Sequence, residues 1–181
     1  MLTTVLAHAG DGAGSFGVGF MHPLHGLDHL LAMVTVGLLS ARMTPKHMWT
    51  LPAMFVAFMF LGGMLGLVWG SDGVTALEWG ISASVMIFGL LAALLPKVNV
   101  YLGNAIVAVF AICHGHAHVA EMGDATVAGY FSGMLLATAL LHLAGLGVGL
   151  GLKKGVGEWT IRLAGGAVAA GFLVTLTGLV G

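Results

Sequence analysis

Two short clusters of polar residues lie inside long apolar runs and hold six of the nine histidines. Imidazole and carboxylate groups lose their hydrogen bonds to water inside a bilayer, so they are rare there unless they bind an ion, line a proton path or meet a partner. Together they suit first-row ions such as nickel, cobalt, zinc or iron, whereas magnesium and calcium prefer all-oxygen sites. The clusters therefore predict a transition-metal site. Its candidate ligands are His22, His25, Asp28 and His29 in the first cluster and His114, His116, His118 and Glu121 in the second.

In the first cluster, the three histidines project within one narrow arc of an ideal helix, with Asp28 beside His25. Pro23 cannot donate a hydrogen bond to the carbonyl four residues earlier, and it favours an extended conformation at His22. We therefore expect the helix to be kinked or broken at His22–Pro23. Asp28 would then offset the positive end of the following helix, which by itself repels a cation.

In the second cluster, His114, His118 and Glu121 follow one another at i, i+4 and i+7 and share one helix face. His116 points roughly the opposite way, so it is the weaker ligand. For His25 and His116, three roles stay open, namely ligand, hydrogen-bond partner of a ligand, or relay. Both clusters fall in the outer halves of their spans, so they are predicted to meet at one depth.

The composition indicates a membrane protein rather than a soluble domain. Hydrophobic residues make up 59% and charged residues 7% of the chain, and the mean hydropathy is +1.04. Apolar stretches of roughly twenty residues predict an all-α bundle of six transmembrane helices in a single domain, residues 1–181. No basic patch is present, which argues against a nucleic-acid partner. The predicted spans are 15–41, 49–70, 76–95, 99–120, 126–152 and 159–180, preceded by an outer tail, residues 1–14.

The basic residues predict the orientation in the bilayer, because cytoplasmic loops carry an excess of lysine and arginine. All six lie in or beside gaps on one side, which places both termini on the outer, periplasmic side of the plasma (inner) membrane. Residues 1–7 end like a secretory signal but lack its basic start, so cleavage that leaves His8 at the amino terminus and an uncleaved tail both stay open. The basic residues are Arg42, Lys46, Lys97, Lys153, Lys154 and Arg162.

Two further patterns bear on the helix packing. The sequence His-Gly-x-x-His occurs at 25–29 and at 114–118, three spans apart, which is compatible with an inverted three-plus-three repeat. Small residues four apart let membrane helices approach closely, within one chain or between chains, so the oligomeric state stays open. Such pairs are Gly62 and Gly66, Gly129 and Gly133, and Gly145 and Gly149.

The two clusters resemble the signatures of the HupE/UreJ family of nickel/cobalt permeases. The first is His22-x5-Asp28-His29, and the second is His114-Gly-x-Ala-His118-x-x-Glu121. The resemblance implies uptake of nickel or cobalt as cargo, with no bound cofactor and no catalysis, and it covers nearly the whole chain. The ligands that it implies are His22, Asp28, His29, His114, His118 and Glu121.

Two other functions stay open on the residues alone. The same groups could hold a catalytic zinc or iron ion in an integral membrane metalloenzyme, although no HExxH motif is present. Paired histidines from two helices could also hold a haem. His142, alone in the fifth predicted span, is either a hydrogen-bond link between helices or a partner of the metal ligands. His47 adjoins a basic loop and is expected at the solvated surface.

Overall fold

The computed structural model describes residues 12–70, 73–94 and 99–180, which form seven helices. No strand occurs among these residues, which confirms the predicted all-helical class. Residues 1–11 of the predicted tail, which include the possible cleavage site after residue 7, lie outside the described residues. The helices are α1 (Gly12–His25), α2 (Leu27–Ala41), α3 (Thr50–Trp69), α4 (Val74–Leu94), α5 (Val100–Ala120), α6 (Val127–Gly155) and α7 (Glu158–Val180).

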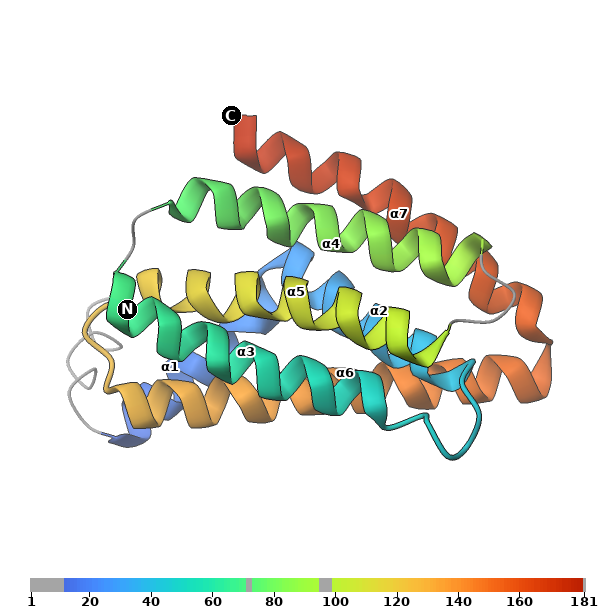
Figure 1. The fold of residues 1–181 in the computed structure, drawn as a ribbon, viewed down its shortest axis with the longest axis horizontal. Coiled ribbons are helices and arrows are strands. Elements are labelled where there is room, and N and C mark those ends of the chain that lie inside the picture. Colours follow the sequence, from blue (N-terminus) through green and yellow to red (C-terminus); the bar gives the residue numbers. More distant parts are fainter. Residues whose placement is uncertain (1–11, 71–72, 95–98, 181) are drawn as a thin grey trace, which may run out of the picture.

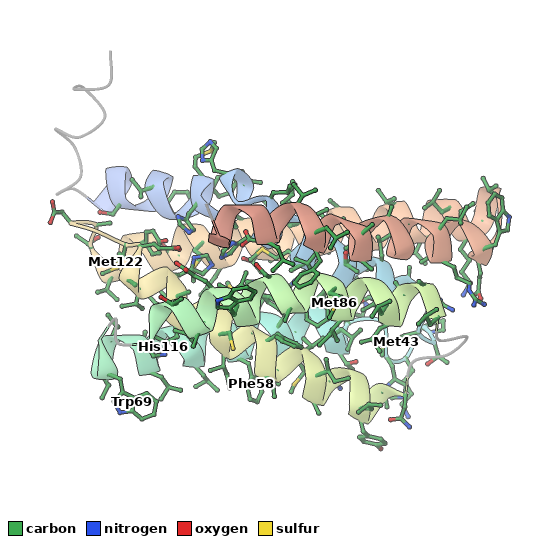
Figure 2. All side chains as sticks on the ribbon, turned by 90° about the horizontal axis from the view of Figure 1, so that it is seen from above. Met43, Phe58, Trp69, Met86, His116 and Met122 are labelled. Carbon is green, nitrogen blue, oxygen red and sulfur yellow. The ribbon has the colours of Figure 1, made fainter. Side chains whose placement is uncertain are left out.

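The helices α3 to α7 run roughly along one long axis, whereas α1 and α2 meet at an angle of 81°, with α2 at the centre of the bundle (Figure 1). The most extensive contacts join α3 to α5, α6 to both α1 and α2, and α4 to α7. In addition, α2 packs against α3, α4 and α7. Figure 2 places Trp69 and Met122 at one end of the bundle and Met43 near the opposite end. The loop after α5 and the loop after α2 therefore lie at opposite ends.

Within the described residues, four helices are long and apolar enough to cross a membrane: Thr50–Trp69, Thr75–Leu94, Val100–Glu121 and Val127–Gly155. The bent pair of α1 and α2 makes a fifth candidate if it is one span. These candidates agree with the first five predicted spans. α7 matches the position of the sixth but is not among the candidates found in the described residues. The six-span bundle and the inverted repeat therefore stay predictions.

The first predicted span does break, but not at His22–Pro23. α1 continues through Pro23 to His25, and the chain turns by 81° before α2. The turn is at Gly26, whose backbone is extended with φ −84° and ψ 115°. A Cβ atom on Gly26 would lie 2.9 Å from His29 Nδ1 and 3.0 Å from Asp28 Oδ1. The break therefore occurs where a missing side chain makes room for a polar pair.

Glycines bring the helix backbones into direct contact within one chain. A Cβ atom on Gly62 would lie 2.3 Å from the Ile112 carbonyl oxygen, which joins α3 to α5. On α6, a Cβ on Gly145 would meet the Val34 carbonyl oxygen and one on Gly133 would meet that of Phe16. These contacts assign members of all three predicted glycine pairs to packing within the chain.

Local signals set both ends of α5, the helix that carries the second cluster. The Asn99 side chain caps its start by accepting hydrogen bonds from the backbone N–H groups of Tyr101 (3.0 Å) and Leu102 (3.2 Å). The helix ends at Ala120 with Glu121 as its C-cap, and Gly123 then adopts φ +58°, a conformation that favours glycine. This ending places the Glu121 carboxylate one turn beyond His118.

Two arginines meet at the carboxyl end of α4. Arg42 donates to the Ala92 carbonyl oxygen, and Arg162 donates to that of Ala93 at 2.8 Å. Carbonyl groups in the last turn of a helix lack helical partners and attract cations. The start of the loop after α2 and the start of α7 therefore lie at the same end of the bundle as the end of α4.

Candidate metal site

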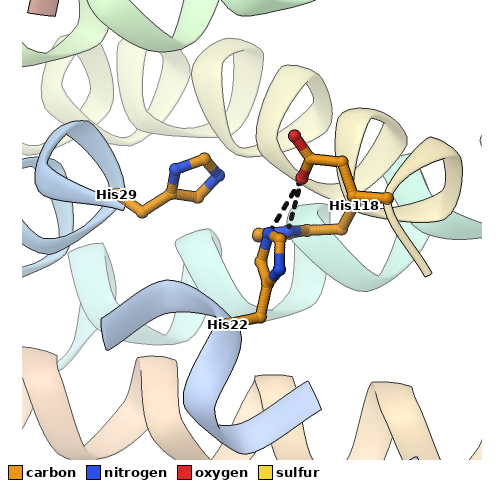
Figure 3. Close-up of side chains that lie close together, drawn as sticks. His22, His29 and His118 are labelled. Atoms are coloured by element: carbon orange, nitrogen blue, oxygen red, sulfur yellow. Dashed lines mark ion pairs between the residues drawn. The ribbon is translucent and has the colours of Figure 1, made fainter. Parts of the chain in front are cut away.

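Four potential ligands from three helices converge at the broken first span (Figure 3). His22 comes from the last turn of α1, His29 from the first turn of α2, and His118 from the last turn of α5. Glu121 follows directly after α5. One ligand atom from each of these four residues lies within 4.8 Å of every other. We call these four residues the outer group.

The Glu121 carboxylate links the two clusters. Its Oε2 atom lies 2.8 Å from His22 Nε2 and 3.7 Å from His118 Nδ1. The His118 ring is also close to both other histidines, with ring centroids 4.7 Å from His22 and 4.6 Å from His29. Residues of the two clusters therefore meet, and their common depth in the membrane stays a prediction.

Asp28 contacts His29 rather than the centre of the group. Its Oδ1 atom lies 2.8 Å from both the backbone nitrogen and Nδ1 of His29. Because a carboxylate only accepts hydrogen bonds, Nδ1 carries the hydrogen and Nε2 keeps its lone pair. That nitrogen is buried and has no hydrogen-bond partner among the described residues. Asp28 thus orients the His29 ring in the way that carboxylates orient metal-bound histidines.

Burial increases from one side of the outer group to the other. The Glu121 side chain is 36% exposed and that of His22 is 26% exposed, whereas that of His118 is 0% exposed. Both ring nitrogens of His118 lack a hydrogen-bond partner in the described part of the chain. An approaching ion would therefore meet Glu121 and His22 first and the buried histidines next.

His114 lies next to the outer group on its buried side. Its ring centroid is 5.1 Å from that of His29, and the residue is fully buried. Its Nδ1 atom donates to the Phe110 carbonyl oxygen at 2.9 Å. Because that oxygen can only accept, Nε2 carries a lone pair, and no hydrogen-bond partner for it occurs among the described residues.

The structure does not bring His25 or His116 to the outer group. His25 ends α1 as an exposed residue. His116 Nε2 instead bonds the Gly70 carbonyl oxygen at 2.9 Å, where α3 ends. The bend at Gly26 separates His25 from His29, which an unbroken helix would have placed on the same face.

Two aromatic residues that the sequence did not single out line the site. The Tyr130 ring centroid lies 5.9 Å from that of His22, and that of Phe55 lies 5.2 Å from that of His114. Both residues are fully buried. Aromatic residues are common in membrane helices, so their sequence positions alone carried no sign of this placement.

The outer group fits a divalent first-row ion. Nitrogen and oxygen ligands lie about 2.0–2.2 Å from such an ion, so ligands on opposite sides are about 4–4.4 Å apart. The observed limit of 4.8 Å requires only small side-chain adjustments. Three imidazoles with one carboxylate match the ligand preferences of nickel, cobalt, zinc and iron.

Comparison with known proteins shows the family to which the chain belongs. The family described as HupE / UreJ protein matches residues 1–175. Protein HupE of Rhizobium leguminosarum bv. viciae is 38% identical over 178 residues, which cover 95% of this chain and 90% of that protein. No solved structure matches the chain. With a family match over almost its whole length and this level of identity, the chain belongs to the HupE/UreJ family.

Proposed function

We infer that this protein is a permease that carries nickel or cobalt across a membrane by way of the outer group. The observation that supports this most strongly is the convergence of four ligand atoms from α1, α2 and α5 within 4.8 Å. The HupE/UreJ family is associated with nickel and cobalt transport, and the ligand types suit these ions. The ion is cargo in this proposal, so the protein needs no resident cofactor.

The gradient of burial favours transport over catalysis. The half-exposed Glu121 offers a negative charge to an arriving cation, and the buried His118 and His29 replace its water. A hydrolytic metal site also keeps an open coordination position for a reacting water. Here further buried imidazoles stand behind the first ligands, an arrangement that passes an ion onward.

The orientation follows from the charges and the ends of the helices. The basic residues Arg42 and Arg162 lie at the end of the bundle opposite the α5–α6 loop. In the plasma membrane, that basic end faces the cytoplasm and the outer group faces the periplasm. Six crossings would then leave both chain termini outside.

The test is uptake of radioactive nickel and cobalt, measured separately in proteoliposomes with and without excess zinc. The wild type is compared with His22→Ala, Asp28→Asn and His118→Ala, with His47→Ala, in the turn between α2 and α3, as the matched histidine control. We expect the wild type and His47→Ala to accumulate metal and the three site variants to lose at least tenfold in uptake while remaining inserted.

No accumulation by the inserted wild type would contradict transport. Tightly bound metal in such an inactive preparation would instead favour the membrane metalloenzyme. Equal uptake by all variants would show that the ion takes another path.

A further inference from the structure

A row of aromatic rings leads from the outer group to the middle of the bundle. The His118 ring centroid is 4.6 Å from that of His29, which is 5.1 Å from that of His114. Phe55 contacts the next two rings edge to face, with centroids 5.2 Å from His114 and 5.0 Å from His142. The row therefore joins α5, α2, α3 and α6 and ends on His142.

His142 is buried without an apparent structural role. It lies near the midpoint of the 29-residue helix α6 and is 1% exposed. Neither of its ring nitrogens has a hydrogen-bond partner among the described residues. Leaving a buried polar group unpaired costs roughly 1–3 kcal/mol. A histidine that served only to link helices would bond a neighbouring helix, and the structure gives no such bond.

His114 presents a second buried lone pair beside Phe55. Its Nδ1 hydrogen is fixed by the Phe110 carbonyl oxygen, which leaves Nε2 as an acceptor. Phe55 touches both this ring and that of His142. Two imidazoles thus flank one aromatic side chain, and a cation could pass between them along the edge of the Phe55 ring.

The surroundings of His142 are soft and neutral. One turn earlier on α6, the Thr138 hydroxyl donates to Met33 Sδ at 3.3 Å and lies 3.9 Å from Met59 Sδ. Thioether sulfur is a weak acceptor and a soft metal ligand. These contacts contain no carboxylate, unlike the outer group with Glu121. An ion held here would bind less tightly than in the outer group, as onward release requires.

Close helix packing fixes the depth of His142. A Cβ atom on Gly37 would lie 2.2 Å from the His142 carbonyl oxygen and 2.5 Å from the Leu146 backbone nitrogen. The backbones of α2 and α6 therefore touch at this level, two turns beyond His29 on α2. The contact sets His142 inward of the outer group.

From these observations we propose that His142 is a ligand of a second, inner position for the divalent metal ion, which the ion reaches from the outer group by way of His114. This rests on the proposed transport function. The ion leaves the outer group, passes Phe55 with His114 as one ligand, and is received by His142 before its release. Each step exchanges one imidazole ligand for another, and no covalent bond of the protein forms or breaks.

The first test uses His142→Leu, which keeps an apolar side chain of similar size and removes both nitrogens. We expect nickel uptake in proteoliposomes to fall at least tenfold. Cobalt binding to the purified protein in detergent should keep its affinity within about twofold, because the outer group is intact. Wild-type uptake in the variant would overturn the proposal, and so would an equal loss of uptake and of cobalt affinity. Failure of the wild type itself to take up metal would instead refute the transport function.

The second test uses His142→Cys and the absorption spectrum of added cobalt. A thiolate bound to cobalt gives a charge-transfer band in the near ultraviolet that imidazole does not give. The wild type is the matched control because it already contains Cys113. We expect the band only in the variant, a result that a packing role for His142 would not produce. The absence of the band in the folded, cobalt-loaded variant would contradict the proposal. If the leucine variant fails to insert, this spectrum decides the question.

Discussion

Asp28 offers the sharpest test of how the outer group works, because it was expected to bind the ion and instead contacts His29. Replacing Asp28 with Asn keeps the shape of the side chain but removes its charge. The 2.8 Å contact with His29 Nδ1 then becomes a neutral hydrogen bond, and bonds to charged groups contribute about 1.5–3 kcal/mol. Loss of such orienting partners lowers metal affinity about 10- to 100-fold, which corresponds to about 1.4–2.8 kcal/mol.

The assay is titration of the purified protein with cobalt, followed by absorption, with X-ray absorption to count the coordinating atoms. We expect Asp28→Asn to bind 10- to 100-fold more weakly with the same number of ligands. Asp124→Asn, the same change at an exposed residue of the α5–α6 loop, should bind as the wild type does. Unchanged affinity in Asp28→Asn would refute the orienting role. A lost ligand would show that Asp28 itself coordinates the ion.

Two further predictions concern glycines. Gly26→Ala should fold, because φ −84° and ψ 115° suit alanine, but its Cβ must displace the His29 ring. Cobalt affinity should fall about tenfold by the same loss of orientation, and normal affinity would count against a fixed His29 position. Gly115→Ala should lower stability by about 1–3 kcal/mol or more, since its Cβ would overlap the Met59 backbone. In the control Gly147→Ala, the added Cβ atom meets nothing within 4 Å. This variant should leave the stability of the protein against denaturation in detergent unchanged or raise it by up to about 1 kcal/mol. Equal stability of these two variants would contradict the close packing of α3 and α5.

Most helices could be predicted from the sequence, because a long apolar run in a membrane protein has little freedom to form anything but a helix. The predicted span 99–120 agrees closely with α5, Val100–Ala120, whose start the structure shows to be capped by Asn99. The break in the first span was expected at Pro23, the strongest local signal. Gly26 carries the turn instead, because the close approach of His29 and Asp28 requires a residue without a side chain. That requirement exists only once the tertiary structure has formed.

The sequence predicted those parts of the site that depend on the spacing of residues along one helix. His118 and Glu121 were expected on one face of a helix, and they lie together. The placement of His142 beside Phe55 depends on the backbone contact of α2 with α6 at Gly37, and no spacing along the chain encodes that contact. An isolated histidine in an apolar span therefore could not be assigned a role from sequence alone.

The most direct test of the central claim is the position of a nickel ion, located by its anomalous X-ray scattering in crystals of the wild-type protein grown with nickel. We expect a peak enclosed by the outer group, about 2.0–2.2 Å from a nitrogen of His29 and of His118 and from a Glu121 oxygen. Asp28 should lie behind His29 without touching the ion. A nickel ion bound elsewhere, with these residues arranged as described here, would contradict the claim that the outer group receives the transported ion.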